Sequence, residues 1–153
     1  MNNFMEIAKN EACMGISENE GGPFGAVIVD DCGNIIAKGN NRVLVDNDPT
    51  AHAEIVAIRR AGEKIKNHDL SGFILYTTCE PCPMCLSAII WSNIKDVYYG
   101  CTKKDAADIG FRDDLIYEYL AGKSEKLLNL KHIDRDECIQ LFEKYKNESK
   151  EIY

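Results

Sequence analysis

Apolar and polar positions alternate along the chain with two periods, one typical of helices and the other of strands. The first segment, residues 3–18, has the spacing of an amphipathic helix. Two short apolar runs follow at residues 25–29 and 35–38, and the turn-forming residues 31–34 separate them. This order predicts a helix and then a pair of antiparallel strands.

The rest of the chain predicts further helices and strands in alternation. Asp48 followed by Pro49 is typical of a helix start, because aspartate is a good N-cap and proline is favoured at the first helical position. Asp134 and Glu137 have the spacing of a capping box. The expected elements are a helix from 49 to about 62, a strand over 73–77, a helix over 86–91, a strand over 97–100, a polar loop over 102–114, a helix over 115–120 and a last helix from 136 onward. This alternation implies an α/β fold in which helices cover both faces of a mixed sheet.

Two short motifs carry the candidate chemistry. The first is H-A-E, which places His52 two residues before Glu54, and the second is P-C-P-M-C, which contains Cys82 and Cys85. One imidazole and two thiolates are the ligands of a catalytic zinc site, in which the fourth position stays open for water. Zinc lowers the pKa of such a water toward 7, and Glu54 would carry its proton to the substrate and the departing amine. The pattern H-x-E…P-C-x-x-C is the signature of zinc-dependent nucleobase deaminases.

The spacing within each motif fits a single metal centre. Cys82 and Cys85 are three residues apart, so both sulfurs point the same way in the first turn of a helix, where unpaired N–H groups favour thiolates. His52 and Glu54 would diverge by about 200° inside a regular helix and converge only at a helix start. A structural zinc site with Cys79 as its fourth ligand is the alternative, but it leaves the His-x-Glu motif unexplained.

Composition and charge limit the partners of the chain. Its 153 residues are 45% hydrophobic, which fits a single domain over 1–153 with a full core. The formal net charge of −7 argues against a nucleic-acid partner, and the lysines near the end of the chain alternate with glutamates instead of forming a basic stripe. No apolar run is long enough for a membrane span, and the first residues do not resemble a secretion signal. Three of the seven cysteines crowd into 79–85, as in a metal site of a reducing compartment, so we expect a cytoplasmic protein.

Over essentially its whole length, the chain resembles the cytidine-deaminase-like superfamily and, within it, the small bacterial guanine deaminases. The segments that carry this resemblance are GGPFGAVIV at 21–29, NDPTAHAE at 47–54, CEPCPMC at 79–85, AADIGF at 106–111 and the terminal Tyr153. The first three are shared in part by tRNA adenosine deaminases and fungal-type cytosine deaminases, so they indicate only the superfamily. Residues 107–114 and the tyrosine-terminated tail are the features similar to guanine deaminases.

This resemblance implies a three-layer α/β/α fold, one zinc ion per subunit and the hydrolysis of guanine at C2 to xanthine and ammonia. It also implies a homodimer in which the C-terminal segment crosses to the other subunit and closes its active site. Phe24 would stack on the purine base, Asn41 would hydrogen-bond it and Ala53 would contact it. Asp113 would assist proton transfer to the leaving amino group, and Tyr153 would cap the pocket of the other subunit. Stacking and edge hydrogen bonds are the usual means of holding a flat base.

Several alternatives stay open from the sequence. Asp114 competes with Asp113 for the proton-transfer role, and Asn40 competes with Asn41 for the base, because only one of two neighbours at a strand end points inward. The competing functions are deamination of adenosine in tRNA, deamination of cytosine or another small aminated heterocycle, and a non-enzymatic interaction module stabilised by zinc. The metal motifs do not distinguish the two enzymatic alternatives from guanine deamination, because the zinc chemistry is the same for each base.

Overall fold

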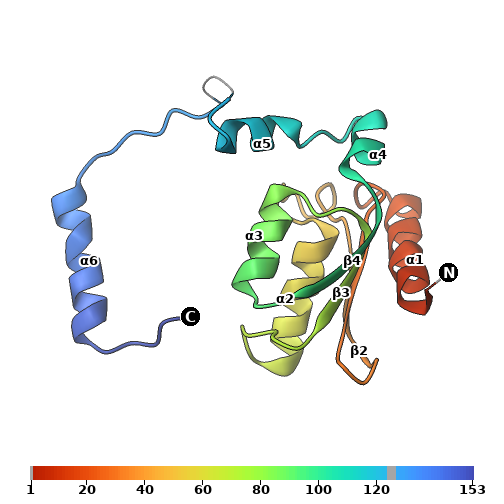
Figure 1. Ribbon diagram of the computed structural model, residues 1–153, viewed down its shortest axis with the longest axis horizontal. Coiled ribbons are helices and arrows are strands. Elements are labelled where there is room, and N and C mark those ends of the chain that lie inside the picture. Colours follow the sequence, from red (N-terminus) through yellow and green to blue (C-terminus); the bar gives the residue numbers. More distant parts are fainter. Residues whose placement is uncertain (1, 124–126) are drawn as a thin grey trace.

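The structure, a computed structural model, describes residues 2–123 and 127–153 (Figure 1). Its helices and strands follow one another in the order α1 (Asn3–Ser17), β1 (Gly25–Val29), β2 (Ile35–Asn40), α2 (Ala53–Ile65), β3 (Ile74–Cys79), α3 (Pro83–Trp91), β4 (Asp96–Cys101), α4 (Lys103–Asp108), α5 (Asp114–Leu120) and α6 (Arg135–Asn147). None of these helices has the length and apolar character that a membrane span requires.

The four strands form one mixed sheet in the order β2-β1-β3-β4. Strand β1 pairs antiparallel with both β2 and β3, whereas β3 and β4 run parallel. Helix α1 covers one face of the sheet, and α2 and α3 cover the other (Figure 1). Every residue of β1 is buried, as expected for a central strand with helices on both sides. The predicted α/β class, the mixed sheet and its three layers are confirmed.

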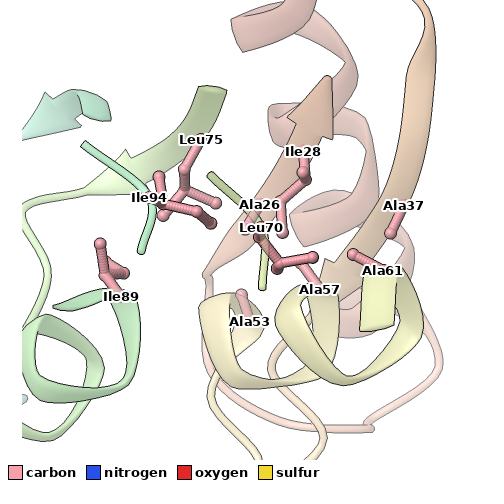
Figure 2. Close-up of a cluster of buried hydrophobic side chains, with 10 residues drawn as sticks. All are labelled: Ala26, Ile28, Ala37, Ala53, Ala57, Ala61, Leu70, Leu75, Ile89 and Ile94. Carbon is pink, nitrogen blue, oxygen red and sulfur yellow. The ribbon is translucent and has the colours of Figure 1, made fainter. Parts of the chain in front are cut away.

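The larger core cluster lies between the sheet and helix α2. This helix turns Ala53, Ala57 and Ala61 toward the strands (Figure 2). The small side chains let the helix approach the sheet closely. Gly39 on β2 is needed for this approach, because a Cβ atom there would lie only 2.6 Å from the carbonyl oxygen of Ala53. Backbone-to-backbone contact of this kind fixes the N-terminal end of α2, where the first metal motif lies.

The predicted start of α2 at residue 49 is wrong. The helix begins at Ala53, one turn later. Asp48 does not cap it, because its carboxylate accepts the backbone N–H of Thr50 at 2.8 Å and the Thr50 hydroxyl at 2.7 Å. The Asp-Pro pair therefore builds the turn that leads into the helix, which is the other common use of such a pair.

Two further predictions about local structure are wrong. The expected polar loop over 102–114 contains helix α4, which a capping box between Thr102 and Asp105 begins. The predicted capping box of Asp134 and Glu137 does not form, because Asp134 has a left-handed backbone with φ of 50° and its side chain makes no cap hydrogen bond. The box that forms has the same spacing, so spacing alone does not distinguish the two sites.

The C-terminal part of the chain lies apart from the three layers (Figure 1). Helix α6 contains no buried residue, and its Leu141 and Phe142 are 66% and 71% exposed. The chain then turns back, and the ring of Tyr153 lies 5.8 Å from the ring of His68. An apolar helix face of this kind is normally covered by another surface.

Candidate metal centre and substrate cavity

His52, Cys82 and Cys85 meet where two helices begin beside each other. His52 is the N-cap of α2 and Cys82 is the N-cap of α3, and both have the extended backbone typical of that position. Cys85 lies within the first turn of α3. The Nδ1 atom of His52 is 3.6 Å from Sγ of Cys82 and 3.5 Å from Sγ of Cys85. The predicted ligands therefore form one compact group.

The spacing of these atoms fits a zinc ion. Zinc bonds of about 2.0–2.1 Å to nitrogen and about 2.3 Å to sulfur, at a tetrahedral angle, place the two ligand atoms about 3.6 Å apart. Among the residues that the structure describes, this group has three members, and Cys79 is not one of them. The thiol of Cys79 instead donates to the carbonyl oxygen of Thr102 at 3.6 Å. A catalytic site with three protein ligands is therefore favoured over a structural site with four.

One thiolate is stabilised before any metal binds. A hydrogen bond from Cys85, supported by His52, lowers the pKa of Cys82 to about 4. The same hydrogen bond raises the pKa of Cys85, and the neighbouring Cys82 raises the pKa of His52. Burial raises the pKa of Cys79 to about 11, so this third cysteine of the region stays a neutral thiol. Binding of zinc would release the protons that Cys85 and His52 still hold.

Glu54 is placed beside the metal ligands without being one of them. It is the second residue of α2 and is only 6% exposed. Its Oε1 accepts the hydroxyl of Thr77 at 3.1 Å, and its Oε2 accepts the thiol of Cys85 at 3.5 Å. Burial raises the pKa of Glu54. A carboxyl group with a raised pKa next to a metal site is suited to taking up and returning protons near neutral pH.

A cavity of about 610 Å³ opens onto this group. His52, Glu54 and Cys82 line its inner end. Phe24 and Phe111 also line it, and their rings meet edge to face, with centroids 5.0 Å apart and planes at 89°. An aromatic face and an aromatic edge at right angles suit a flat aromatic ligand. The cavity is thus large enough and apolar enough to hold a small heterocycle beside the metal ligands.

The two adjacent asparagines have different surroundings, and only Asn41 lines the cavity. Asn41 is buried and lines the cavity, and its side-chain oxygen accepts the backbone N–H of Val43 at 3.2 Å. Asn40 does not line the cavity and donates its amide to Glu20 at 2.6 Å. Of the two, Asn41 is therefore the one that lines the cavity, and its contact with a base stays a prediction.

The two adjacent aspartates also have different surroundings, and only Asp113 lines the cavity. Asp113 lines the cavity, and burial raises its pKa. Asp114 does not line the cavity and accepts two hydrogen bonds from the Arg112 guanidinium, at 3.2 and 2.5 Å. Only Asp113 combines access to the cavity with a raised pKa, which is the combination that a proton-transfer group needs.

Two of the predicted substrate contacts do not line this cavity within one chain. The side chain of Ala53 is fully buried in the core cluster, so a contact with the base would have to come from its backbone. Tyr153 is 80% exposed and lies near His68, in a second hollow beside α2 and α3. Its predicted place is the cavity of another subunit, which a single chain does not test.

Several lining residues had no predicted role in the cavity, and three of them, Phe111, Lys103 and Glu80, come from or contact the segment that begins at α4. Phe111 lies in a segment that carried the resemblance, but its pairing with Phe24 depends on tertiary structure. Lys103 and Glu80 reach the cavity because α4 begins beside the cysteine motif. The capping-box spacing of residues 102–105 was a local signal for this helix, although the same spacing at 134–137 forms no box.

Comparison with known proteins agrees with this geometry. Residues 1–101 match the family described as the cytidine and deoxycytidylate deaminase zinc-binding region. The chain belongs to this deaminase family. Among its relatives, it is 50% identical over 123 residues to the guanine deaminase of Bacillus subtilis (strain 168), an alignment that covers 80% of this chain and 78% of the relative.

Two solved structures extend the comparison. The X-ray structure of guanine deaminase from Bacillus subtilis matches with a TM-score of 0.92 at 43% identity, covering 100% of this chain and 99% of that one. A structure from work on tRNA:A34 deaminases matches with a TM-score of 0.61 at 46% identity, covering 65% of this chain and 75% of that one. The expected superfamily, its zinc-binding character and the resemblance to guanine deaminases are confirmed.

Replacing a metal ligand should remove zinc, whereas replacing the neighbouring cysteine should not. We expect Cys82→Ser to lose the bound zinc, because two ligands hold this ion far less tightly than three. Cys79→Ser is the matched control, since it changes a buried cysteine of the same region that lies outside the ligand group. Zinc content after gel filtration, measured by atomic absorption, checks both variants. Loss of zinc from Cys79→Ser would contradict the three-ligand site.

Glu54→Gln should stabilise the zinc-free protein increasingly as the pH rises. Because burial raises the pKa of Glu54, the folded state holds that proton more tightly than the unfolded state, and stability is lost as the pH rises through the folded value. Glutamine has no proton to lose. The free energy of unfolding of Glu54→Gln should therefore show no pH-dependent gain over that of the wild type below about pH 4, and the gain should grow toward neutral pH. Urea unfolding of chelator-treated protein at several pH values measures the difference. An advantage of the wild type at pH 7 would refute this account of Glu54.

Proposed function

We propose that the protein is a zinc-dependent guanine deaminase that converts guanine and water to xanthine and ammonia. The observation that carries the proposal is the match to a guanine deaminase structure over 100% of this chain, which includes the segment that bears Phe111 and Asp113. The match to the tRNA:A34 deaminase structure covers only 65% of this chain. The net charge of −7 also disfavours a polyanionic substrate such as tRNA.

Three side chains would hold the base. Phe24 stacks on the purine plane, and Phe111, at a right angle to Phe24, bounds the base at one side. The hydrogen bond from the backbone of Val43 occupies the side-chain oxygen of Asn41, which leaves its amide nitrogen to donate to an acceptor on the base. Recognition of a flipped or free base by stacking and edge hydrogen bonds is the common mode of this enzyme class.

His52, Cys82 and Cys85 would hold the zinc ion, which when bound supplies the Lewis acidity that activates water at neutral pH. Glu54 takes the proton of the attacking water and delivers it to a ring nitrogen of the base, and the Thr77 hydroxyl holds its carboxylate in place. Asp113, with its raised pKa, assists the transfer of the second proton of that water from the new oxygen on C2 to the departing amino group. The C–N bond at C2 of guanine then breaks, the C2 carbonyl forms and ammonia leaves.

The proposal includes a homodimer in which each C-terminal segment closes the cavity of the other subunit and Tyr153 caps the bound base. Its support is the exposed apolar face of α6 and the position of Tyr153 outside the cavity of its own chain. The domain proposed for each subunit is a single deaminase domain over 1–153. All seven cysteines are free thiols, which favours a cytoplasmic enzyme.

Ammonia release tests the substrate. The zinc-loaded protein should deaminate guanine and should leave adenine, cytosine, cytidine, adenosine and an adenosine-34 tRNA unchanged at equal concentration. Glu54→Gln should lower kcat for guanine by about 10²–10⁴-fold or more with zinc content unchanged, because the proton carrier is lost and the ligands are not. Turnover of tRNA or cytosine without turnover of guanine would contradict guanine as the substrate but would leave the proposed zinc chemistry unchanged.

Mixed dimers test whether the tail acts between subunits. A chain with Glu54→Gln lacks the proton carrier, and a chain truncated before Ile152 lacks the terminal tyrosine, so each homodimer should be inactive. Co-expressed with two different affinity tags and purified through both, the mixed dimer should regain about half of the wild-type activity, since the intact tail of one chain covers the intact Glu54 of the other. If the tail closes its own subunit, the mixed dimer stays inactive.

A further inference from the structure

One side of the cavity is formed by a segment that the hydrophobic core does not hold. Residues 103–116, here called the outer wall, run from α4 to the start of α5. Six of them line the cavity: Lys103, Ala106, Phe111, Arg112, Asp113 and Ile116. Neither α4 nor α5 contains a buried residue. The position of the outer wall therefore depends on the ring contact of Phe111 with Phe24 and on the few polar contacts at its start.

Three hydrogen bonds join the start of the outer wall to the chain just before the cysteine ligands. The backbone N–H of Lys103 donates to Oε2 of Glu80 at 3.0 Å. The backbone N–H of Glu80 donates to the carbonyl oxygen of Cys101 at 2.8 Å, and the Cys79 thiol donates to that of Thr102 at 3.6 Å. Of the three, only the bond from Lys103 ends on a side-chain oxygen of Glu80, so it is the one that a substitution of Glu80 removes.

The outer wall is tied together internally, so its start determines where its far end lies. The capping box of Thr102 begins α4. The backbone N–H of Phe111 donates to the carbonyl oxygen of Ala106 at 3.0 Å, which turns the chain back toward the cavity. The ammonium of Lys103 lies 4.5 Å from the centre of the Tyr117 ring, which links α4 to α5. A shift at residue 103 would therefore be transmitted to Phe111 and to Asp113, which follows it by two residues.

We propose that Glu80 is a positioning residue, whose carboxylate fixes the outer wall to the metal loop and thereby sets where Phe111 and Asp113 stand relative to the metal ligands. Glu80 lies two residues before Cys82 in the chain and bonds the first residue of α4, so one side chain connects both parts of the site. It acts through Asp113 and Phe111 and takes no part in the reaction itself. This inference rests on the proposed function for its kinetic consequence but not for its structural one.

The test uses zinc-loaded, full-length protein and two substitutions of Glu80. Glu80→Ala removes the acceptor and should speed hydrogen exchange across residues 102–113, with kcat/KM for guanine reduced about tenfold or more, as expected for the loss of a charged hydrogen bond. Glu80→Gln retains an oxygen acceptor and should recover most of that loss. Asp108→Ala is the matched control, because it breaks only the exposed ion pair with Lys104 in the same helix. It should change neither measurement.

A double-mutant cycle separates positioning from direct contact with substrate. In an Asp113→Asn background, Glu80→Ala should lower kcat by less than about twofold, because the group that it positions has lost its chemistry. Independent, multiplicative effects would overturn the proposal, as would loss of zinc from Glu80→Ala or unchanged exchange over 102–113. If the wild type failed to deaminate guanine, the exchange measurement would still decide the role of Glu80, so the two failures remain distinct.

Discussion

The site depends on two helices that begin beside each other on the same side of the sheet. Helix α2 places His52 at its N-cap, and helix α3 does the same for Cys82, so an imidazole and a thiolate meet at 3.6 Å. A cap residue has an extended backbone, which lets His52 and Glu54 flank one centre although they lie only two residues apart. The unpaired N–H groups of α3 favour the thiolates that a metal requires.

Packing away from the site holds these helix ends in place. The alanines of α2 pack against the sheet, and Gly39 allows the backbone of β2 to approach that of α2 (Figure 2). Strand β3 leads through the cysteine loop into α3 and also carries Thr77, whose hydroxyl binds Glu54. The core therefore fixes the metal ligands and the proton carrier, whereas the opposite side of the cavity is held by polar contacts and by the ring contact of Phe111 with Phe24. The metal ligands and Glu54 thus belong to the firmly packed part of the chain, and the other side of the cavity belongs to a segment with no buried helix residue.

The sequence predicted correctly those features that depend on residues close together in the chain. The spacing of the metal motifs identified His52, Cys82 and Cys85, because a helix start converts that spacing directly into geometry. The α/β class and the hairpin followed from alternation of apolar runs. The start of α2 was misplaced because an Asp-Pro pair serves a turn as well as a helix cap. Asp113 lines the cavity and Asp114 pairs with Arg112, and this difference between two neighbouring aspartates is set by tertiary structure, which no pattern reveals. The role proposed for Tyr153 involves a second subunit, which no pattern within one chain describes.

X-ray absorption at the zinc edge of the fully loaded protein measures directly whether the metal centre keeps an open position. For a catalytic centre with three protein ligands we expect two sulfur ligands at about 2.3 Å and two lighter ligands at about 2.0–2.1 Å, one the imidazole of His52 and the other from solvent. A third sulfur ligand in place of the solvent ligand would mean that Cys79 joins the site and closes it. That result would contradict a catalytic centre with an open position and, with it, the roles assigned here to Glu54 and to the cavity.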